Sequence, residues 1–88
     1  MNKTTVYKSV TDGHETWKII KKNGVYHWEG SKRSCYNCPK VAFDYEDVAR
    51  LYSNYMFIKY GRQLEVYWDD YCGEWHLTTS YREIWVWT

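Results

Sequence analysis

The dipeptide Asn23-Gly24 constrains this chain most strongly, because it lies between two segments in which apolar and polar side chains alternate. Asn-Gly favours the positive backbone φ angles that a two-residue type I′ hairpin needs. We therefore predict a hairpin between strands over residues 15–22 and 25–29. Asp12-Gly13 is a second dipeptide of this kind, and it follows β-branched and aromatic residues over 4–10. These signals predict a three-stranded antiparallel meander.

A single helix is predicted after Asp44, which is a favourable N-cap residue. Asp47 follows three positions later, near the positive end of the helix dipole. Apolar residues recur at helical spacing over 48–55. The segment 55–60 also fits a short strand, but we favour a helix that continues to about residue 59. Gly61 then supplies the left-handed cap.

The remaining chain predicts strands over residues 63–69, 74–79 and 82–88, the last as a separate strand or as a continuation past a bulge. The expected fold class is therefore α+β. We expect an antiparallel sheet of 5–6 strands with one helix packed on one face, in the order β-β-β-α-β-β(-β). The length of 88 residues suits a single domain over residues 1–88.

Aromatic side chains make up 20% of the chain, with six Trp, ten Tyr and two Phe. One helix, about 22 Å long, covers less than half of one face of a five-stranded sheet that is about 24 Å wide. The segment at 84–87 alternates aliphatic and Trp side chains, so both faces of the sheet carry large apolar groups. Either the sheet coils over itself, or a second copy or a foreign protein covers the other face.

Tyr and Trp are enriched in the residues that dominate protein–protein binding. We interpret the chain as a non-enzymatic protein-binding module that uses an aromatic sheet surface to hold another protein or itself, as a homodimer. Its size and composition suit a small phage-type inhibitor, used for host takeover or against host defence. The expected binding residues are aromatic or basic: Trp17, Tyr26, Trp28, Trp85, Trp87, Lys21 and Lys22.

An alternative function is a single-stranded nucleic-acid-binding domain. Residues 1–43 carry eight basic and three acidic side chains, a net charge of +5. Residues 44–88 carry four basic and eight acidic side chains, a net charge of −4. We expect the two halves to interleave in space, which would mix these charges. Cations and stacking aromatics nevertheless occur together, as in single-strand binders: Lys18, Lys21 and Lys22 beside Trp17, with Tyr26, Trp28, Lys32 and Arg33.

The cysteines form the one chemical motif. Cys35 and Cys38 have the two-residue spacing that lets one tight turn present two thiolates to a tetrahedral metal. Cys72 and His76 offer two further ligands at a second turn. The predicted cofactor is therefore a structural zinc ion in a Cys3His site that could stabilise either function. The alternative is three unrelated reduced cysteines. A redox Cys-x-x-Cys motif is disfavoured, since it needs its first cysteine at a helix N-terminus.

Other chemistry is not indicated. No Ser or Cys lies beside a His in a defensible triad order, and no Gly-rich phosphate loop is present, so we expect no enzyme activity. No apolar run is long enough to span a bilayer, and no membrane partner is expected. The first residues lack the hydrophobic stretch of a secretory signal, which predicts a cytoplasmic protein.

Overall fold

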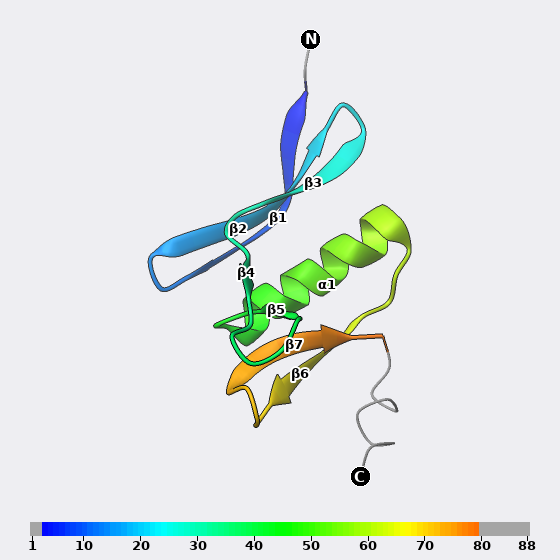
Figure 1. Cartoon of the computed structure of the whole chain (residues 1–88). Helices are drawn as coiled ribbons and strands as arrows, with labels where there is room; N and C mark the ends of the chain where they lie inside the picture. The colour runs from blue at the N-terminus through cyan, green and yellow to red at the C-terminus, as the bar shows by residue number, and fades with distance from the viewer. Residues whose placement is uncertain (1–2, 80–88) are drawn as a thin grey trace.

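The computed structural model describes residues 3–79 (Figure 1). Along this part of the chain, a three-stranded meander comes first. A short two-stranded ribbon, one helix and a final β-hairpin follow. The strand expected over residues 82–88, with Trp85 and Trp87, lies outside the described residues. The elements are β1 (Thr4–Asp12), β2 (Glu15–Lys22), β3 (Val25–Glu29), β4 (Arg33–Ser34), β5 (Val41–Ala42), α1 (Glu46–Tyr60), β6 (Glu65–Asp69) and β7 (Glu74–Thr78).

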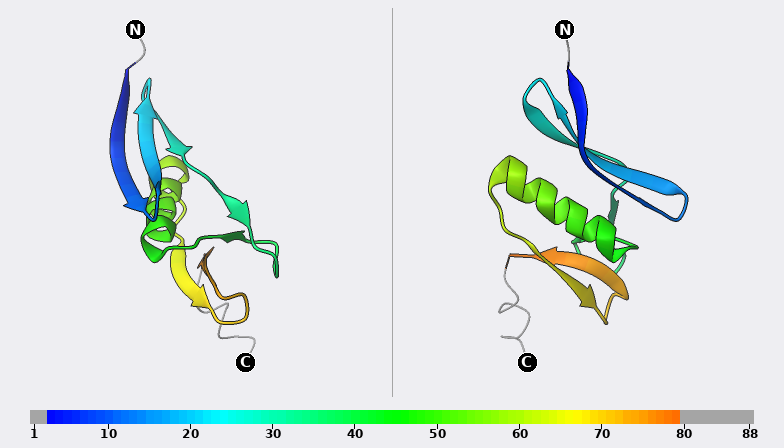
Figure 2. Two further views of the ribbon diagram at one scale, coloured as in Figure 1. Left: turned by 90° about the vertical axis from the view of Figure 1, so that its left-hand side faces the viewer. Right: turned by 180° about the vertical axis from the view of Figure 1, so that it is seen from behind.

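The described strands form three small antiparallel sheets, β1-β2-β3, β4-β5 and β6-β7. The α+β class with one helix is confirmed, but the expected single sheet of 5–6 strands is wrong. The reason is the position of α1, which lies between the meander and the β6–β7 hairpin and contacts strands of both (Figure 2). The helix separates the edges that a continuous sheet would have to join.

Both predicted hairpins of the meander are confirmed. Asn23 and Gly24 have φ angles of 52° and 81°, as a type I′ turn requires. In β1, a bulge between Val6 and Lys8 shifts the pairing with β2. The register places Val10 opposite Trp17, so these two side chains share the face that packs against α1.

The core lies between the meander and α1. The ring of Trp28 on β3 meets two helix residues, with ring centroids 4.9 Å from Tyr52 and 5.9 Å from Tyr55. One helix therefore covers much of the aromatic surface of the meander. The buried residues come from β2, from the segment after β5 and from α1: Trp17, Ile19, Phe43, Val48, Ala49, Leu51 and Tyr55.

The start of α1 differs from the prediction, whereas its end agrees. Tyr45 occupies the N-cap position and makes no side-chain cap hydrogen bond. Asp44 instead accepts a hydrogen bond of 2.5 Å from Arg33, because that guanidinium offers a full charge where a backbone N–H offers a dipole. Segment 55–60 is helical, and Gly61 caps it in the left-handed conformation with φ of 69°.

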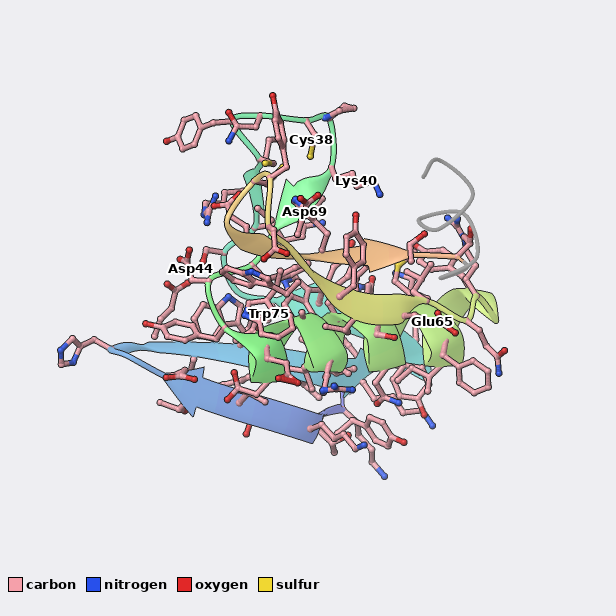
Figure 3. All side chains as sticks on the ribbon, turned by 90° about the horizontal axis from the view of Figure 1, so that it is seen from below. Cys38, Lys40, Asp44, Glu65, Asp69 and Trp75 are labelled. Carbon is pink, nitrogen blue, oxygen red and sulfur yellow. The ribbon has the colours of Figure 1, made fainter. Side chains whose placement is uncertain are left out.

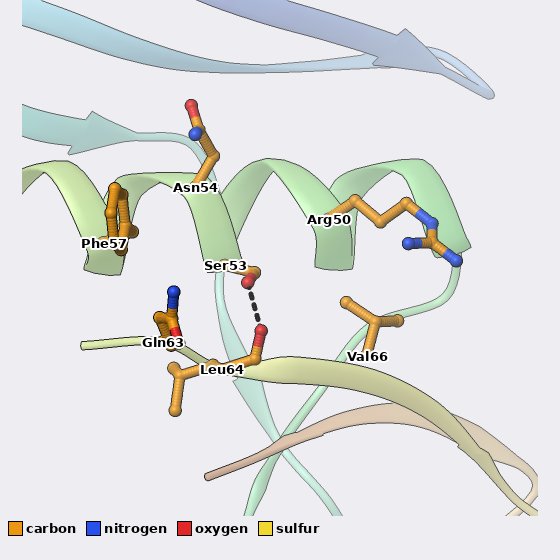
Figure 4. Close-up of a pocket in the computed structure, with 7 residues that line it drawn as sticks. All are labelled: Arg50, Ser53, Asn54, Phe57, Gln63, Leu64 and Val66. Carbon is orange, nitrogen blue, oxygen red and sulfur yellow. Dashed lines mark hydrogen bonds between the residues drawn. The ribbon is translucent and has the colours of Figure 1, made fainter. Parts of the chain in front are cut away.

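The final hairpin is attached to the rest of the chain at both ends. The hydroxyl of Ser53 on α1 donates a 2.6 Å hydrogen bond to the carbonyl of Leu64, just before β6 (Figure 4). At the other end, Phe43 and Trp75 exchange two backbone hydrogen bonds of 3.0 and 3.2 Å. These contacts hold β7 against the segment that carries the first two cysteines.

The two halves of the chain interleave less than expected. The meander lies at one end of the molecule and the β6–β7 hairpin at the other, with α1 between them (Figures 1 and 2). From the first half, the segment that includes β4 and β5 reaches the hairpin. The lysines of the meander therefore stay apart from the acidic residues of the hairpin.

Candidate metal centre

Three cysteines and one histidine meet where the β4–β5 loop approaches the β6–β7 turn. Cys35 and Cys38 come from the loop, Cys72 comes from the turn, and His76 comes from β7. One potential ligand atom from each side chain lies within 4.8 Å of all the others. The structure thus brings together the four residues that the sequence predicts as a set. Figure 3 shows Cys38 on this loop, close to Asp69 at the end of β6.

The distances from Cys38 Sγ to two other ligand atoms match a tetrahedral metal site. The Sγ atoms of Cys38 and Cys72 are 3.7 Å apart, and Cys38 Sγ lies 3.6 Å from Nε2 of His76. A tetrahedral zinc ion with ordinary bond lengths holds two sulfurs about 3.8 Å apart, and a sulfur and a nitrogen about 3.6 Å apart. A disulfide would need a sulfur–sulfur distance of about 2.05 Å, so the three cysteines are free thiols.

The β4–β5 ribbon shapes the loop that presents the first two thiols. Ser34 pairs with Val41, and the N–H of Cys35 donates a 2.8 Å hydrogen bond to the carbonyl of Lys40. Inside the loop, the N–H of Asn37 lies 3.4 Å from Cys35 Sγ and donates to it. A backbone donor of this kind stabilises a thiolate and fixes its direction.

Asp69 shapes the turn that presents the third thiol. Its carboxylate accepts hydrogen bonds from the N–H groups of Tyr71 at 2.9 Å and Cys72 at 3.1 Å. Its carbonyl accepts a 2.7 Å bond from the N–H of Gly73, whose φ of 68° favours glycine. Asp at the start of a turn that ends in Gly is a recognisable sequence signal for this role.

His76 is the innermost member of the cluster, with 0% of its surface exposed. Its Nδ1 atom lies 2.8 Å from the carbonyl oxygen of Val41, which can only accept a hydrogen bond. Nδ1 therefore carries the proton, and Nε2 directs its lone pair towards Cys38. A histidine that donates from one nitrogen and binds metal with the other is the usual arrangement in metal sites.

The three thiols differ in acidity. Burial raises the pKa of Cys35, and it raises the pKa of Cys72 to about 12. Burial also acts on Cys38, but hydrogen bonds from the N–H of Lys40 and from the other two thiols outweigh it, so the pKa of Cys38 is lowered. A metal ion that binds here must displace the protons of the remaining thiols.

Two cations lie beside the cluster. The guanidinium of Arg33 donates hydrogen bonds to Glu74 and Asp44, and it holds the pKa of Glu74 below its usual range. The Nζ atom of Lys40 lies 2.8 Å from the hydroxyl of Tyr67, and this contact raises the pKa of Lys40. Three thiolates around a divalent ion would carry a net charge of −1. Lys40 offsets part of this charge, whereas Arg33 already pairs with two carboxylates.

Among the predicted binding residues within residues 3–79, the aromatic ones do not form one exposed face, and Trp85 and Trp87 lie outside the described residues. Trp17 lies in the core at 6% exposure and donates from Nε1 to the carbonyl of Ser31. Trp28 is half-buried against α1. Tyr26 is also half-buried, with the Nζ atom of Lys21 5.3 Å from its ring centroid. Lys21 and Lys22 are exposed.

Two exposed tyrosines instead flank the cysteine cluster. Tyr36 is 94% exposed and stands between Cys35 and Cys38, and Tyr71 is 86% exposed and directly precedes Cys72. Trp68 on β6 is half-exposed, but its ring packs edge-on against that of Trp75, on the face of the hairpin opposite to His76. The exposure of Tyr36 and Tyr71 could have been predicted from the sequence. Both residues lie next to predicted metal ligands, and a metal-bound turn directs the intervening side chains outward.

Comparison of the chain with protein-family models, with curated proteins and with solved structures finds no match. Within residues 3–79, no helix is long and apolar enough to cross a membrane. Functional inference for this chain therefore depends on the geometry of its own residues.

Proposed function

We propose that the protein is a non-enzymatic protein-binding module whose fold is held by a structural zinc ion on Cys35, Cys38, Cys72 and His76. The observation that carries this proposal is the convergence of four ligand atoms within 4.8 Å of one another, with Cys72 Sγ and His76 Nε2 both at the spacing of a tetrahedral site from Cys38 Sγ. Thiolate and imidazole ligands in this geometry favour zinc. Four protein ligands leave no position for water or substrate, which is characteristic of a structural site and not of a catalytic one.

The position of the cluster explains what the ion would contribute. It would cross-link the β4–β5 loop to the β6–β7 hairpin, two small sheets that share few backbone hydrogen bonds. Structural zinc contributes on the order of 10 kcal/mol to the folding of small metal-binding peptides. A domain of this size buries a smaller fraction of its surface than a large one, so a cross-link between such loops adds to a small core.

The proposed contact surface is the metal end, defined by Tyr36 and Tyr71 on the loop and the turn that carry the cysteines. Tyr and Trp supply large contact areas and lose little side-chain entropy on binding. Zinc would hold the turns that carry the two tyrosines, which lowers the cost of ordering them in a complex. The β6–β7 hairpin also carries four acidic residues and no basic one, so a partner with a basic surface complements it.

A module without catalytic residues acts on its partner by occupying it. Coverage of a basic surface on an enzyme would block that enzyme in one-to-one proportion, which is the mode of action of the phage-type inhibitor that the sequence favours. A second copy of the chain is the other partner of this class. Sedimentation at two concentrations distinguishes it, because a homodimer dissociates on dilution.

The experiment is a differential capture with the zinc-loaded protein as bait. Retained proteins are compared between the wild type, a Tyr36→Ala/Tyr71→Ala double variant, and Phe57→Ala as a matched control. Phe57 is exposed on α1, outside the metal end. We expect a partner that the wild type and Phe57→Ala retain and the double variant loses. If the double variant retains the same proteins, the metal end is not the contact surface.

A further inference from the structure

A second surface lies at the C-terminal half of α1, away from the β6–β7 turn (Figure 1). It is a groove of about 280 Å³ between the helix and the segment that follows β3. We call it the cationic groove. Its lining combines tyrosines with two cations: Lys32, Tyr52, Tyr55, Met56, Tyr60 and Arg62.

The tyrosines of the cationic groove form a connected row along the helix. The ring centroids of Tyr52 and Tyr55 are 5.7 Å apart, and those of Tyr55 and Tyr60 are 6.3 Å apart. Tyr55 is buried, whereas Tyr60 is 57% exposed at the open end of the row. The row therefore ends in an accessible ring that packing against its neighbours holds in place.

Positive charge accompanies each ring. The Nζ atom of Lys32 lies 5.5 Å from the centroid of Tyr52. The Nζ atom of Lys59 lies 5.5 Å from the centroid of Tyr55 and 5.4 Å from that of Tyr60. The segment 48–64 supplies most of the lining, and it contains no acidic residue.

We propose that the cationic groove binds single-stranded nucleic acid, with phosphates at Lys32, Lys59 and Arg62 and a base stacked on Tyr60. Ordered aromatic rings interleaved with cations are how proteins hold single strands without a base-pairing code. A polyanion without bases would make ionic contacts with the lysines and the arginine, but it could not stack on the tyrosine rings. The activity goes beyond protein binding at the metal end and uses none of its residues.

The test is fluorescence anisotropy of a labelled oligothymidine of about 12 nucleotides, a length within the span of known single-strand sites. We expect Tyr60→Ala to weaken binding roughly 5-fold or more, because one stacked base is lost. Arg62→Ala should reduce the slope of log affinity against log salt by about 0.7, the value for one phosphate contact on a single strand. Circular dichroism of both variants verifies that they are folded.

Matched controls separate the groove from general surface charge. Arg50→Ala removes an exposed cation that pairs with Glu46 on the first turns of α1, and it should leave binding unchanged. Heparin serves as a polyanion without bases, and Tyr60→Ala should not alter its binding. Equal losses for heparin and oligothymidine, or tighter binding of poly-glutamate than of oligothymidine, would overturn the proposal.

The outcomes of the two proposals are distinguishable. Zinc-loaded wild-type protein that fails to bind oligothymidine at low salt refutes the groove and leaves the metal end untouched. Oligothymidine binding that persists in the Tyr36→Ala/Tyr71→Ala variant supports the groove, whatever the capture experiment finds.

Discussion

The Nδ1 atom of His76 lies 2.8 Å from the carbonyl oxygen of Val41, the residue that begins β5. This hydrogen bond links a ligand on the final hairpin to the ribbon that carries Cys35 and Cys38. It also fixes the tautomer, because a carbonyl can only accept, and it leaves Nε2 to face Cys38 Sγ at 3.6 Å. This hydrogen bond therefore orients the ring for metal binding.

We predict the protonation pattern of His76 from this contact. In zinc-loaded protein, long-range proton–nitrogen NMR spectra should show the His76 proton on Nδ1 and a metal-shifted Nε2. His27 is exposed on β3 and serves as the internal control, because zinc should not shift its nitrogen signals. A His76 proton on Nε2 in the zinc-loaded protein would contradict the arrangement.

Removal of one ligand should reveal the stabilising effect of the metal. Cys38→Ser takes away the thiol with the lowered pKa, and we expect it to reduce the free energy of unfolding by about 3 kcal/mol or more in the presence of zinc. Urea denaturation measures this loss. After chelation the wild type should fall to the stability of the variant, and an unchanged gap between them would show that the cysteine acts through packing alone.

Local signals explain what could be predicted from the sequence. The turn at Asn23-Gly24 depends on two adjacent residues, so the hairpin follows without knowledge of the rest of the fold. The four metal-site residues also follow locally, since Cys35 and Cys38 share one loop and Cys72 lies in a turn four residues before His76 on β7, so the prediction needed only that the loop and the turn meet. They do meet, because Phe43 and Trp75 pair through their backbones.

Tertiary effects explain what could not be predicted. The strands β4 and β5 have two residues each, which is too short for any periodic signal. The position of α1 between two sheets depends on long-range packing, so the single sheet was a wrong extrapolation from strand order. Asp44 failed as the helix cap because Arg33, eleven positions earlier, binds its carboxylate.

Arg33 should matter more than other surface arginines. Its guanidinium contacts Glu74, whose side chain is largely buried beside Cys35. Arg33→Met would leave that carboxylate without its cation, and we expect a loss of about 1–3 kcal/mol. Arg50→Met is the matched control, since its exposed pair with Glu46 should contribute less than about 0.5 kcal/mol. Thermal and urea denaturation compare the two, and equal losses would contradict a special role for Arg33.

The raised pKa of Asp47 makes the stability of the fold depend on pH, with a sign that can be predicted. Burial and the nearby charge of Asp12 raise the pKa of Asp47 in the folded protein. The folded state therefore binds this proton at a higher pH than the unfolded chain does, and its stability gains as the pH falls through the raised pKa. Asp12→Asn removes the repulsion and should stabilise the protein at pH 7 by no more than about 0.5 kcal/mol, since solvent screens the pair.

The measurement for Asp12→Asn is the urea midpoint as a function of pH. The gain of Asp12→Asn over the wild type should disappear in acid, once the pH falls below the raised pKa of Asp47 and that carboxylate no longer carries a charge to repel. Asp70→Asn, an exposed substitution in the β6–β7 turn, should show no such pH-dependent gain. A gain that persists in acid would mean that the repulsion between Asp12 and Asp47 is not its cause.

Native mass spectrometry of the intact chain tests the structural zinc site most directly. Protein produced with zinc available should carry one zinc ion per chain, and Cys38→Ser should carry none. A wild-type chain that retains no metal, or one lighter by two hydrogens because Cys38 and Cys72 have formed a disulfide, would contradict the structural zinc site.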